Sequence, residues 1–396
     1  MKDLLGTISM GIRAPIFREG DDVAQITANC ILEASKEHSI PIADRDVIAL
    51  TESIVARTEG NYVTVDEVAR DVAAKFGDKK IGVIFPILSR NRFAMCFKGI
   101  CRGAKGGIVL MLSLPADEVG NHLVDEAEFF KADIGNKVIN EEEYRQIFGY
   151  KKHEFTGVDY VEYYRDLAEA EGCEIEIIFN NNPAAILDYT KNVLYCDIHT
   201  RFRTRHILEE HGAELLYGMD NICAEPSAEG KGCNPKYGLL GSNKADEERL
   251  KLFPKTGEEV VAKIQKIIYE ETGKKVEVLV YGDGAFKDPV GKIWELADPV
   301  VSPAYTEGLK GRPNELKLKA LADGKFADLN GEELKAAITE SIKEKGGDLV
   351  GDMSSQGTTP RQLTDLLGSL SDLTSGSGDK GTPIVWIKGY FKTYAD

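Results

Sequence analysis

The sequence predicts a globular protein that mixes β-strands with α-helices in two or three lobes. Its 396 residues exceed what one typical hydrophobic core accommodates. Hydrophobic residues make up 42% of the chain and charged residues 29%, which is the composition of an ordered protein. Short apolar segments alternate along it with amphipathic segments of helical period, which indicates mixed sheets and helices.

Five short segments rich in β-branched residues are predicted to be strands, and they are residues 81–88, 107–113, 174–179, 276–280 and 382–387. Two helices carry start signals. Thr256 with Glu259, and Thr359 with Gln362, have the spacing of a capping box ahead of an apolar stripe. Gly273 is expected to end the first of these helices.

The charge and the cysteines limit the partners and the compartment. A formal net charge of -16 repels nucleic acid and anionic membranes, so we expect neither as a partner. An anionic substrate would then need a local basic site. The seven cysteines include no CxxC, which favours a reducing compartment. Neither a signal peptide nor a membrane span is found in the sequence, so we expect a cytoplasmic protein.

A glycine-rich loop lies near the carboxyl end. There is no Walker P-loop, but Gly376 to Gly381 matches G-x-G-x-x-G. A predicted helix precedes this loop and a strand follows it, whereas a dinucleotide-binding fingerprint requires the reverse order. Its backbone N–H groups could cradle phosphate, or the loop could be a flexible surface turn.

A second candidate site follows the strand at 276–280. There Gly282, Asp283 and Gly284 precede Lys287 and Asp288. A carboxylate between two glycines can approach a metal-bound phosphate without steric hindrance, and a lysine beside it can offset the phosphate charge. The alternative is an ordinary Asp-Gly turn.

A third candidate is residues 196–205, which we interpret as a strand. Its odd positions would then share one face, and they are Asp197, His199, Arg201, Arg203 and Arg205. Three arginines on one face predict an anion site, to which residues 89–92 could add, and Asp197 with His199 could bind a metal. The alternative is a solvated edge strand whose charges prevent aggregation.

The two ends of the chain resemble the coenzyme F420 gamma-glutamyl ligase family. The resemblance rests on the order and spacing of several motifs and covers about half the chain, whereas residues 76–219 have no counterpart that we can place. The matching segments are residues 14–22, 46–48, 53–60, 238–243, 271–275 with the strand before Asp283, and 365–385.

The resemblance implies an α+β fold and a homodimer. Residues 1–75 and 220–396 would form a ligase core, and residues 76–219 a central inserted α/β lobe. The family uses GTP, or here ATP, with Mg²⁺ or Mn²⁺ to phosphorylate the carboxylate of a small anionic acceptor. The amine of an amino acid, glutamate, then displaces the phosphate and leaves an amide.

Carried over residue by residue, the resemblance implies a nucleotide site and a metal site. Asp283 falls on a metal-binding aspartate. Arg57 stands where the family usually has lysine. The nucleotide-binding positions are Ala14, Pro15, Ile16, Phe17, Arg57, Asn243, Gly376, Gly378 and Gly381.

Three departures from the family pattern alter this site. Leu240 stands where the family has a second metal-binding aspartate, Gly284 where it has a hydroxyl residue, and Glu52 where it has a small polar one. We predict that Asp288, or Asp197 with His199, replaces the missing ligand. Lys287 and Arg201 are expected to act with Asp283 in catalysis, Arg201 by holding the acceptor's anionic groups.

Several functions remain open on the sequence. The acceptor could be the deazaflavin coenzyme or a folate. The same Asp283 site could instead serve a phosphohydrolase, with water as the attacking group. A non-catalytic nucleotide-binding homologue is the third alternative, and Leu240 is its best support.

Overall fold

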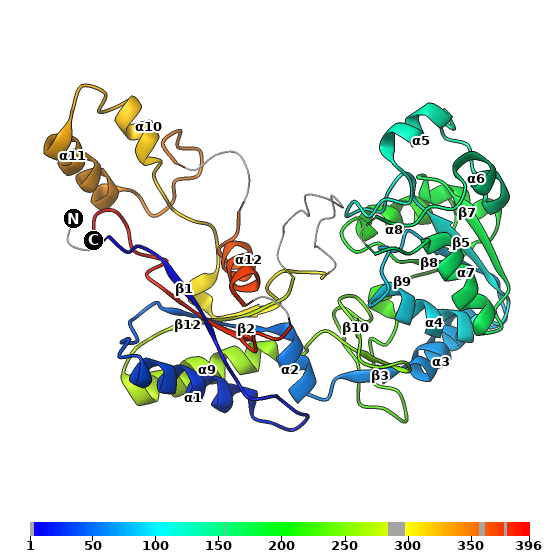
Figure 1. Ribbon diagram of the computed structural model, residues 1–396, viewed down its shortest axis with the longest axis horizontal. Helices are drawn as coiled ribbons and strands as arrows, with labels where there is room; N and C mark the ends of the chain where they lie inside the picture. Colours follow the sequence, from blue (N-terminus) through cyan, green and yellow to red (C-terminus); the bar gives the residue numbers. More distant parts are fainter. Residues whose placement is uncertain (1–3, 155, 284–297, 356–360, 376–377) are drawn as a thin grey trace.

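The computed structural model describes residues 4–154, 156–283, 298–355, 361–375 and 378–396. The chain forms two lobes joined by a small sheet (Figure 1). Their sheets have five strands and six strands, and the joining sheet has three. The fold is of the α+β class, as predicted. No helix within these ranges is long and apolar enough to cross a membrane.

The first lobe, called the terminal lobe here, is built from both ends of the chain. The strand order of its sheet is β1-β14-β2-β12-β13. Among the described strands of this sheet, β12 and β2 pair in parallel and the other neighbours pair antiparallel. The strands are β1 (Ile8–Ile12), β2 (Val47–Thr51), β12 (Glu277–Tyr281), β13 (Ala304–Tyr305) and β14 (Ile384–Lys388).

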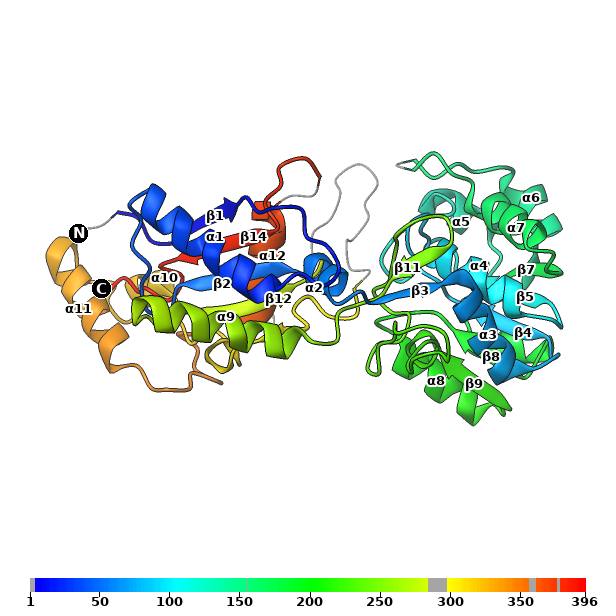
Figure 2. The same cartoon turned by 90° about the horizontal axis from the view of Figure 1, so that it is seen from below.

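Helices cover both faces of this sheet. On one face α1 (Val23–Glu37) and α9 (Gly257–Thr272) lie side by side, and α12 (Leu363–Ser375) lies on the other (Figure 2). Because side chains alternate along a strand, Ile48 and Val278 pack toward α1 and α9, whereas Ala49 and Leu279 pack toward α12. Both faces are therefore apolar cores.

The second lobe, called the central lobe, holds the strands β4 (Ile81–Ile84), β5 (Ile108–Leu112), β6 (Ile139–Asn140), β7 (Ile175–Phe179), β8 (Asn192–Tyr195) and β9 (Leu215–Gly218). Their order is β6-β7-β5-β4-β8-β9, and only the edge strand β6 is antiparallel to its neighbour. The helices are α3 (Val65–Phe76), α4 (Phe93–Gly103), α5 (Glu126–Ala132), α6 (Glu141–Phe148), α7 (Tyr160–Ala170), α8 (Arg201–Glu210) and the short η1 (Pro183–Asp188). The domain boundaries given for the sequence stay predictions.

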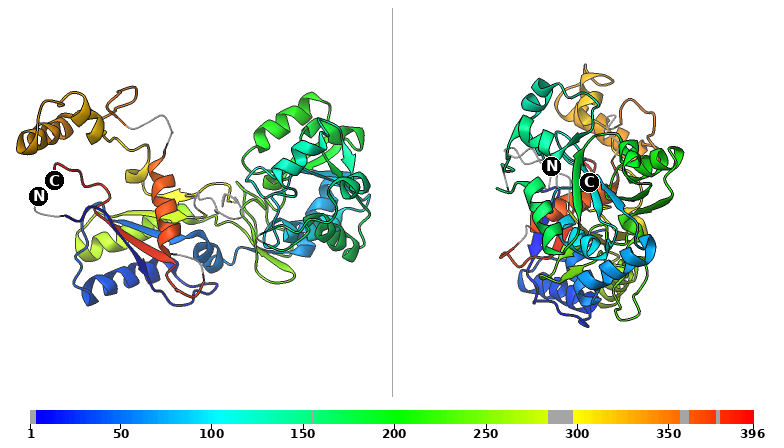
Figure 3. Two further views of the ribbon diagram at one scale, coloured as in Figure 1. Left: turned by 45° about the horizontal axis from the view of Figure 1, so that its top comes forward. Right: turned by 90° about the vertical axis from the view of Figure 1, so that its right-hand side faces the viewer.

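The joining sheet consists of β3 (Tyr62–Thr64), β10 (Asn243–Lys244) and β11 (Arg249–Lys251), and α2 (Glu52–Thr58) leads into it. The short η2 (Met219–Asn221) and η3 (Glu307–Leu309) and the helices α10 (Leu318–Asp323) and α11 (Gly331–Glu344) complete the described elements. Figure 3 shows α10 and α11 beside both chain termini, at the end of the molecule away from the central lobe.

The five predicted strands are confirmed, with ends that differ by a few residues. The strand predicted at 196–205 is wrong, because Arg201 begins helix α8. Good helix formers continue to Glu210, and the carboxylate of Glu118 accepts the backbone N–H groups of residues 198–200 just before the helix. Neighbouring helical residues point about 100° apart, so Arg203 leaves the face that Arg201 and Arg205 share.

The capping box predicted at Thr256 is also wrong. Glu59 caps α9 instead, and its carboxylate accepts the backbone N–H of Thr256 at 2.9 Å and of Lys255 at 3.2 Å. Gly273 ends the helix in the left-handed conformation, as predicted. The other predicted box begins at Thr359, outside the described residues.

We expect Glu59→Ala to lower the free energy of unfolding by about 1 kcal/mol, because it leaves amides at the start of α9 without an acceptor. Glu259→Ala is the control, since Glu259 lies in the same first turn. Glu259→Ala should lower the free energy of unfolding by less than half as much as Glu59→Ala. Urea unfolding of both variants checks this, and equal losses would contradict the cap assigned to Glu59.

Candidate functional site

A cleft of about 520 Å³ opens beside the carboxyl ends of β2 and β12. The two strands are parallel, so Thr51 and Tyr281 end at the same edge of the sheet. The segment before β14 reaches this edge too, since Pro383 accepts the backbone N–H of Thr51 at 3.0 Å. Chain segments far apart in sequence therefore meet at one site.

The cleft brings together most of the predicted nucleotide-binding residues. Its lining includes Ala14, Pro15, Ile16, Phe17, Arg57, Asn243, Asp283, Gly378 and Gly381. Ala14 donates its N–H to the carbonyl of Gly381 at 3.2 Å, which ties the amino-terminal segment to the glycine-rich loop. Gly378 and Gly381 have φ of 94° and 64°, a conformation that glycine adopts without strain. Gly376 lies outside the described residues.

The other predicted residues are not among the described residues that line the cleft. Lys287 and Asp288 lie outside the described residues. Asp197, His199 and Arg201 belong to the central lobe, where β8 leads into α8, and the described lining of the cleft does not include them. Their catalytic and metal-binding roles stay predictions.

Asp197 and Arg201 have local partners in the central lobe. The buried carboxylate of Asp197 accepts the hydroxyls of Thr200 at 2.6 Å and Thr204 at 2.7 Å, and burial raises its pKa to about 6. The guanidinium of Arg201 lies 3.6 Å from Asp220 and stacks over the ring of Phe202. Asp197 Oδ1 and Arg201 Nε nevertheless have no hydrogen-bond partner among the described residues, although both atoms are buried.

Arg92 is a partner of Asp283 that the sequence did not indicate. Arg92 Nη2 donates to the carboxylate of Asp283, and Nη1 donates to Asp298 at 2.7 Å. Asp298 also accepts the N–H of Asp283 at 2.8 Å. A Cβ on Gly282 would lie 2.2 Å from the Asp298 carboxylate, so the glycine leaves room for this pairing.

The sequence predicts that residues 89–92 add to an anion site formed by the arginines of 201–205. The structure instead pairs Arg92 with two carboxylates that lie 191 and 206 residues later. Asp298 lies in none of the sequence motifs described above. A basic cluster directly after the predicted strand at 81–88 was the only signal for Arg92, and it did not identify the partner.

A second ion pair reaches the cleft through Glu52, which is part of its lining. Glu52 at the start of α2 accepts two bonds from Lys251 on β11, at 2.7 and 2.6 Å. Both side chains are at most 9% exposed. Burial raises the pKa of the Glu52 carboxyl, and the attraction of Lys251 opposes that rise. We call these paired groups, which are Glu52, Lys251, Arg92, Asp283 and Asp298, the floor of the cleft, and Glu52, Arg92 and Asp283 belong to the cleft lining itself. They combine three carboxylates with two cations.

In the described part of the chain, no group of three or more His, Cys, Asp or Glu side chains could hold a metal ion. The described side chains therefore do not form a complete site for a divalent metal by themselves. Leu240 is buried in the core beside Arg92, and both line a cavity of about 40 Å³. Asp283, one-third exposed on the cleft, does fit as a single ligand. Mg²⁺ commonly binds one or two carboxylates together with substrate phosphates.

Comparison with known proteins identifies the family. No curated protein matches the chain significantly. The family model described as F420-0:Gamma-glutamyl ligase matches residues 11–389. The cleft lies within that match and is lined by the residues on which the resemblance rests. Because the match covers nearly the whole sequence, the chain belongs to the F420-0:gamma-glutamyl ligase family.

Proposed function

We propose that the protein is a nucleotide-dependent ligase that adds L-glutamate to a small-molecule carboxylate through an acyl phosphate. Its family is that of amide-forming gamma-glutamyl ligases. GTP is the proposed phosphoryl donor, with ATP as the alternative. The observation that carries this proposal is the cleft that gathers Ala14 to Phe17, Arg57, Asn243, Asp283, Gly378 and Gly381.

The proposed reaction has two steps. The terminal phosphoryl group of the nucleotide passes to a carboxylate oxygen of the acceptor and leaves the nucleoside diphosphate. The amine nitrogen of glutamate then attacks the acyl carbon, the bond from that carbon to the phosphate oxygen breaks, and phosphate departs. The amine loses its proton to solvent, and the product is an amide. A divalent cation bound with the nucleotide would supply charge neutralisation, with Asp283 as its protein ligand.

The described residues suit the parts of this reaction that fall to the protein. Gly378 and Gly381 allow the backbone to approach phosphates closely, so that N–H groups can donate to them. Ile16 is 80% exposed while Phe17 beside it is buried, so the segment offers an apolar surface to a base from an anchored position. Arg57 adds a cation to the cleft lining.

Mass spectrometry of the products tests the proposal. The purified protein is incubated with GTP or ATP, Mg²⁺ or Mn²⁺, glutamate, and a panel of deazaflavin and pterin carboxylates. We expect one acceptor to gain a glutamyl unit, with phosphate released only when acceptor and glutamate are both present. Phosphate release at full rate without glutamate would establish a phosphohydrolase. Nucleotide binding in calorimetry without product or phosphate release would indicate the non-catalytic homologue, and no nucleotide binding at all would overturn the proposal.

The role of Asp283 can be measured separately. We expect Asp283→Asn to weaken metal-dependent nucleotide binding by at least about tenfold, because the neutral amide is a poor ligand for a divalent cation. The fold should persist, since this side chain is one-third exposed. Asp44→Asn is the matched control, an exposed aspartate paired with Lys274. Unchanged metal affinity in Asp283→Asn would refute the assignment.

A further inference from the structure

Arg92 crosses from one lobe to the other at the floor of the cleft. It lies at the start of α4 in the central lobe, yet both of its carboxylate partners belong to the terminal lobe. Its side chain is 20% exposed and lines the cleft that also contains Asn243 and Asp283. Burial lowers its pKa, but Asp298 and Asp283 together raise the pKa above its usual value, so the guanidinium is charged at every working pH.

Three hydrogen bonds hold the backbone just before and at Arg92. Asp117 accepts the N–H of Leu88 at 2.8 Å, Tyr164 accepts that of Ser89 at 3.1 Å, and Ser89 in turn accepts that of Arg92 at 2.9 Å. These bonds fix the chain between the end of β4 and the start of α4.

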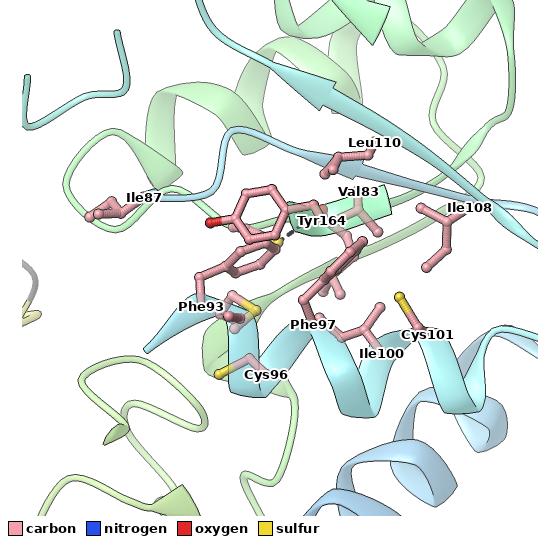
Figure 4. Packing of buried hydrophobic residues seen from close by; sticks show 14 of the residues in the cluster. Val83, Ile87, Phe93, Cys96, Phe97, Ile100, Cys101, Ile108, Leu110 and Tyr164 are labelled. Carbon is pink, nitrogen blue, oxygen red and sulfur yellow. Dashed lines mark hydrogen bonds between the residues drawn. The ribbon is translucent and has the colours of Figure 1, made fainter. Parts of the chain in front are cut away.

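The residue that follows Arg92 anchors the helix. The ring of Phe93 stacks on Phe97 with 5.4 Å between centroids and meets the edge of Tyr164 at 5.5 Å (Figure 4). All three rings belong to the buried core of the central lobe. A charged side chain supported in this way keeps its place without a ligand, which is what a preorganised binding group requires.

The topology of the central lobe also directs this loop toward a ligand. In the strand order β6-β7-β5-β4-β8-β9, the chain runs outward from β4 through β5 and β7, and returns to the other side of β4 as β8. Parallel sheets bind ligands outside the carboxyl ends of the strands at such a switch point. Arg92 follows β4, and Ile198, which lines a small cavity together with Arg92, follows β8.

The carboxylates at the floor of the cleft must be balanced by a cation if a phosphate is to bind there. Glu52, Asp283 and Asp298 would repel a nucleotide phosphate, and Lys251 is committed to Glu52 by two bonds. Arg92 offsets Asp283 and Asp298 at once. A guanidinium has five N–H donors, so it can hold two carboxylates and still donate to a phosphate oxygen.

We propose that Arg92 is a phosphate-binding residue of the nucleotide site, supplied by the central lobe, and that its guanidinium contacts the phosphoryl group that is transferred. This inference rests on the proposed function. It adds to that function a reason for the central lobe, which completes a site that the terminal lobe does not complete alone. Arg92 also provides a positive charge for the phosphate at a site where Leu240 cannot bind a metal ion.

Calorimetric titration with GTP tests this in Arg92→Ala, Arg92→Lys and the wild type, at low and high Mg²⁺ and with added methylguanidinium. We expect Arg92→Ala to weaken nucleotide binding by about tenfold to a hundredfold at low Mg²⁺, because a charge-assisted hydrogen bond is lost. Methylguanidinium or high Mg²⁺ should restore part of the affinity, since each returns a cation to the floor of the cleft. Arg92→Lys should fall between the two, because an ammonium lacks the planar fork that spans two carboxylates.

Arg145→Ala is the matched control. Arg145 pairs with Asp159 at 2.7 Å inside the central lobe and is buried as deeply as Arg92. Its loss should lower the melting temperature while nucleotide affinity stays within about twofold of wild type, because distant sites act independently.

Three outcomes distinguish a failure of the proposed function from a failure of the role assigned to Arg92. Wild-type protein that binds neither GTP nor ATP would overturn the proposed function itself. Wild-type binding combined with undiminished binding by Arg92→Ala would overturn only the role of Arg92. Weakened binding that neither methylguanidinium nor Arg92→Lys improves would make Arg92 a structural tie between the lobes, and would also overturn the inference.

Discussion

Replacing Lys251 by alanine is expected to lower the free energy of unfolding by about 3–5 kcal/mol, because it leaves a buried carboxylate without its partner. Lys251 lies on β11 of the joining sheet, and Glu52 begins α2 and lines the cleft. The pair therefore joins the sheet between the lobes to the floor of the site. Urea unfolding followed by circular dichroism measures the loss.

The loss should depend on pH in a defined direction. Burial raises the pKa of Glu52 in the folded protein, and removing Lys251 removes the attraction that opposes this rise. A carboxyl whose folded pKa exceeds its unfolded value binds more protons when folded, so stability falls as pH rises through that window. The deficit of Lys251→Ala should thus be small near pH ~4 and grow toward neutral pH. A deficit that is the same at all pH values would contradict an ionised, buried Glu52.

A double variant supplies the control. Glu52→Gln with Lys251→Met replaces the ion pair by neutral groups of similar volume, a change that is often neutral or stabilising. We expect this variant to recover most of the stability that Lys251→Ala loses. A double variant as unstable as Lys251→Ala would show that the ion pair itself stabilises the fold, because this variant keeps the side-chain volume and leaves no unpaired charge.

The sequence predicted those features that neighbouring residues determine. The strands at 107–113 and 276–280 were found because each is a short apolar run, and Gly273 was found because a helix end favours glycine in the left-handed conformation. The resemblance indicated residues for one nucleotide site that lie far apart in the chain. The structure brings most of them to one cleft because β2 and β12 are parallel and end at the same edge.

The features that the sequence missed depend on contacts between distant segments. Glu59 caps a helix that begins 198 residues later, and Arg92 pairs with carboxylates of the other lobe. Neither pairing leaves a pattern in a single sequence. The strand prediction for residues 196–205 was wrong for a different reason. Alternating arginines fit a strand face, but they are equally good helix formers, and the local pattern did not decide between the two.

The second large effect is expected at Trp386 in β14, which is 1% exposed and packs against the core under α1 and α9. Its indole N–H donates to Asp46 at 3.0 Å, and Lys388 donates to the same carboxylate at 2.6 Å. Trp386→Ala should lower the free energy of unfolding by about 3–5 kcal/mol, since the cavity left by an indole in a close-packed core collapses only in part.

The control for this prediction separates packing from the hydrogen bond. Trp386→Phe keeps an aromatic ring but loses the bond to Asp46, so it should cost only about 1–2 kcal/mol. Since β14 begins directly after Pro383 in the cleft lining, loosening of the strand should also reduce nucleotide affinity in Trp386→Ala. Urea unfolding and calorimetry on the same samples measure both effects. If Trp386→Ala lost stability but bound nucleotide as well as Trp386→Phe, the core under β14 would not be what positions the cleft.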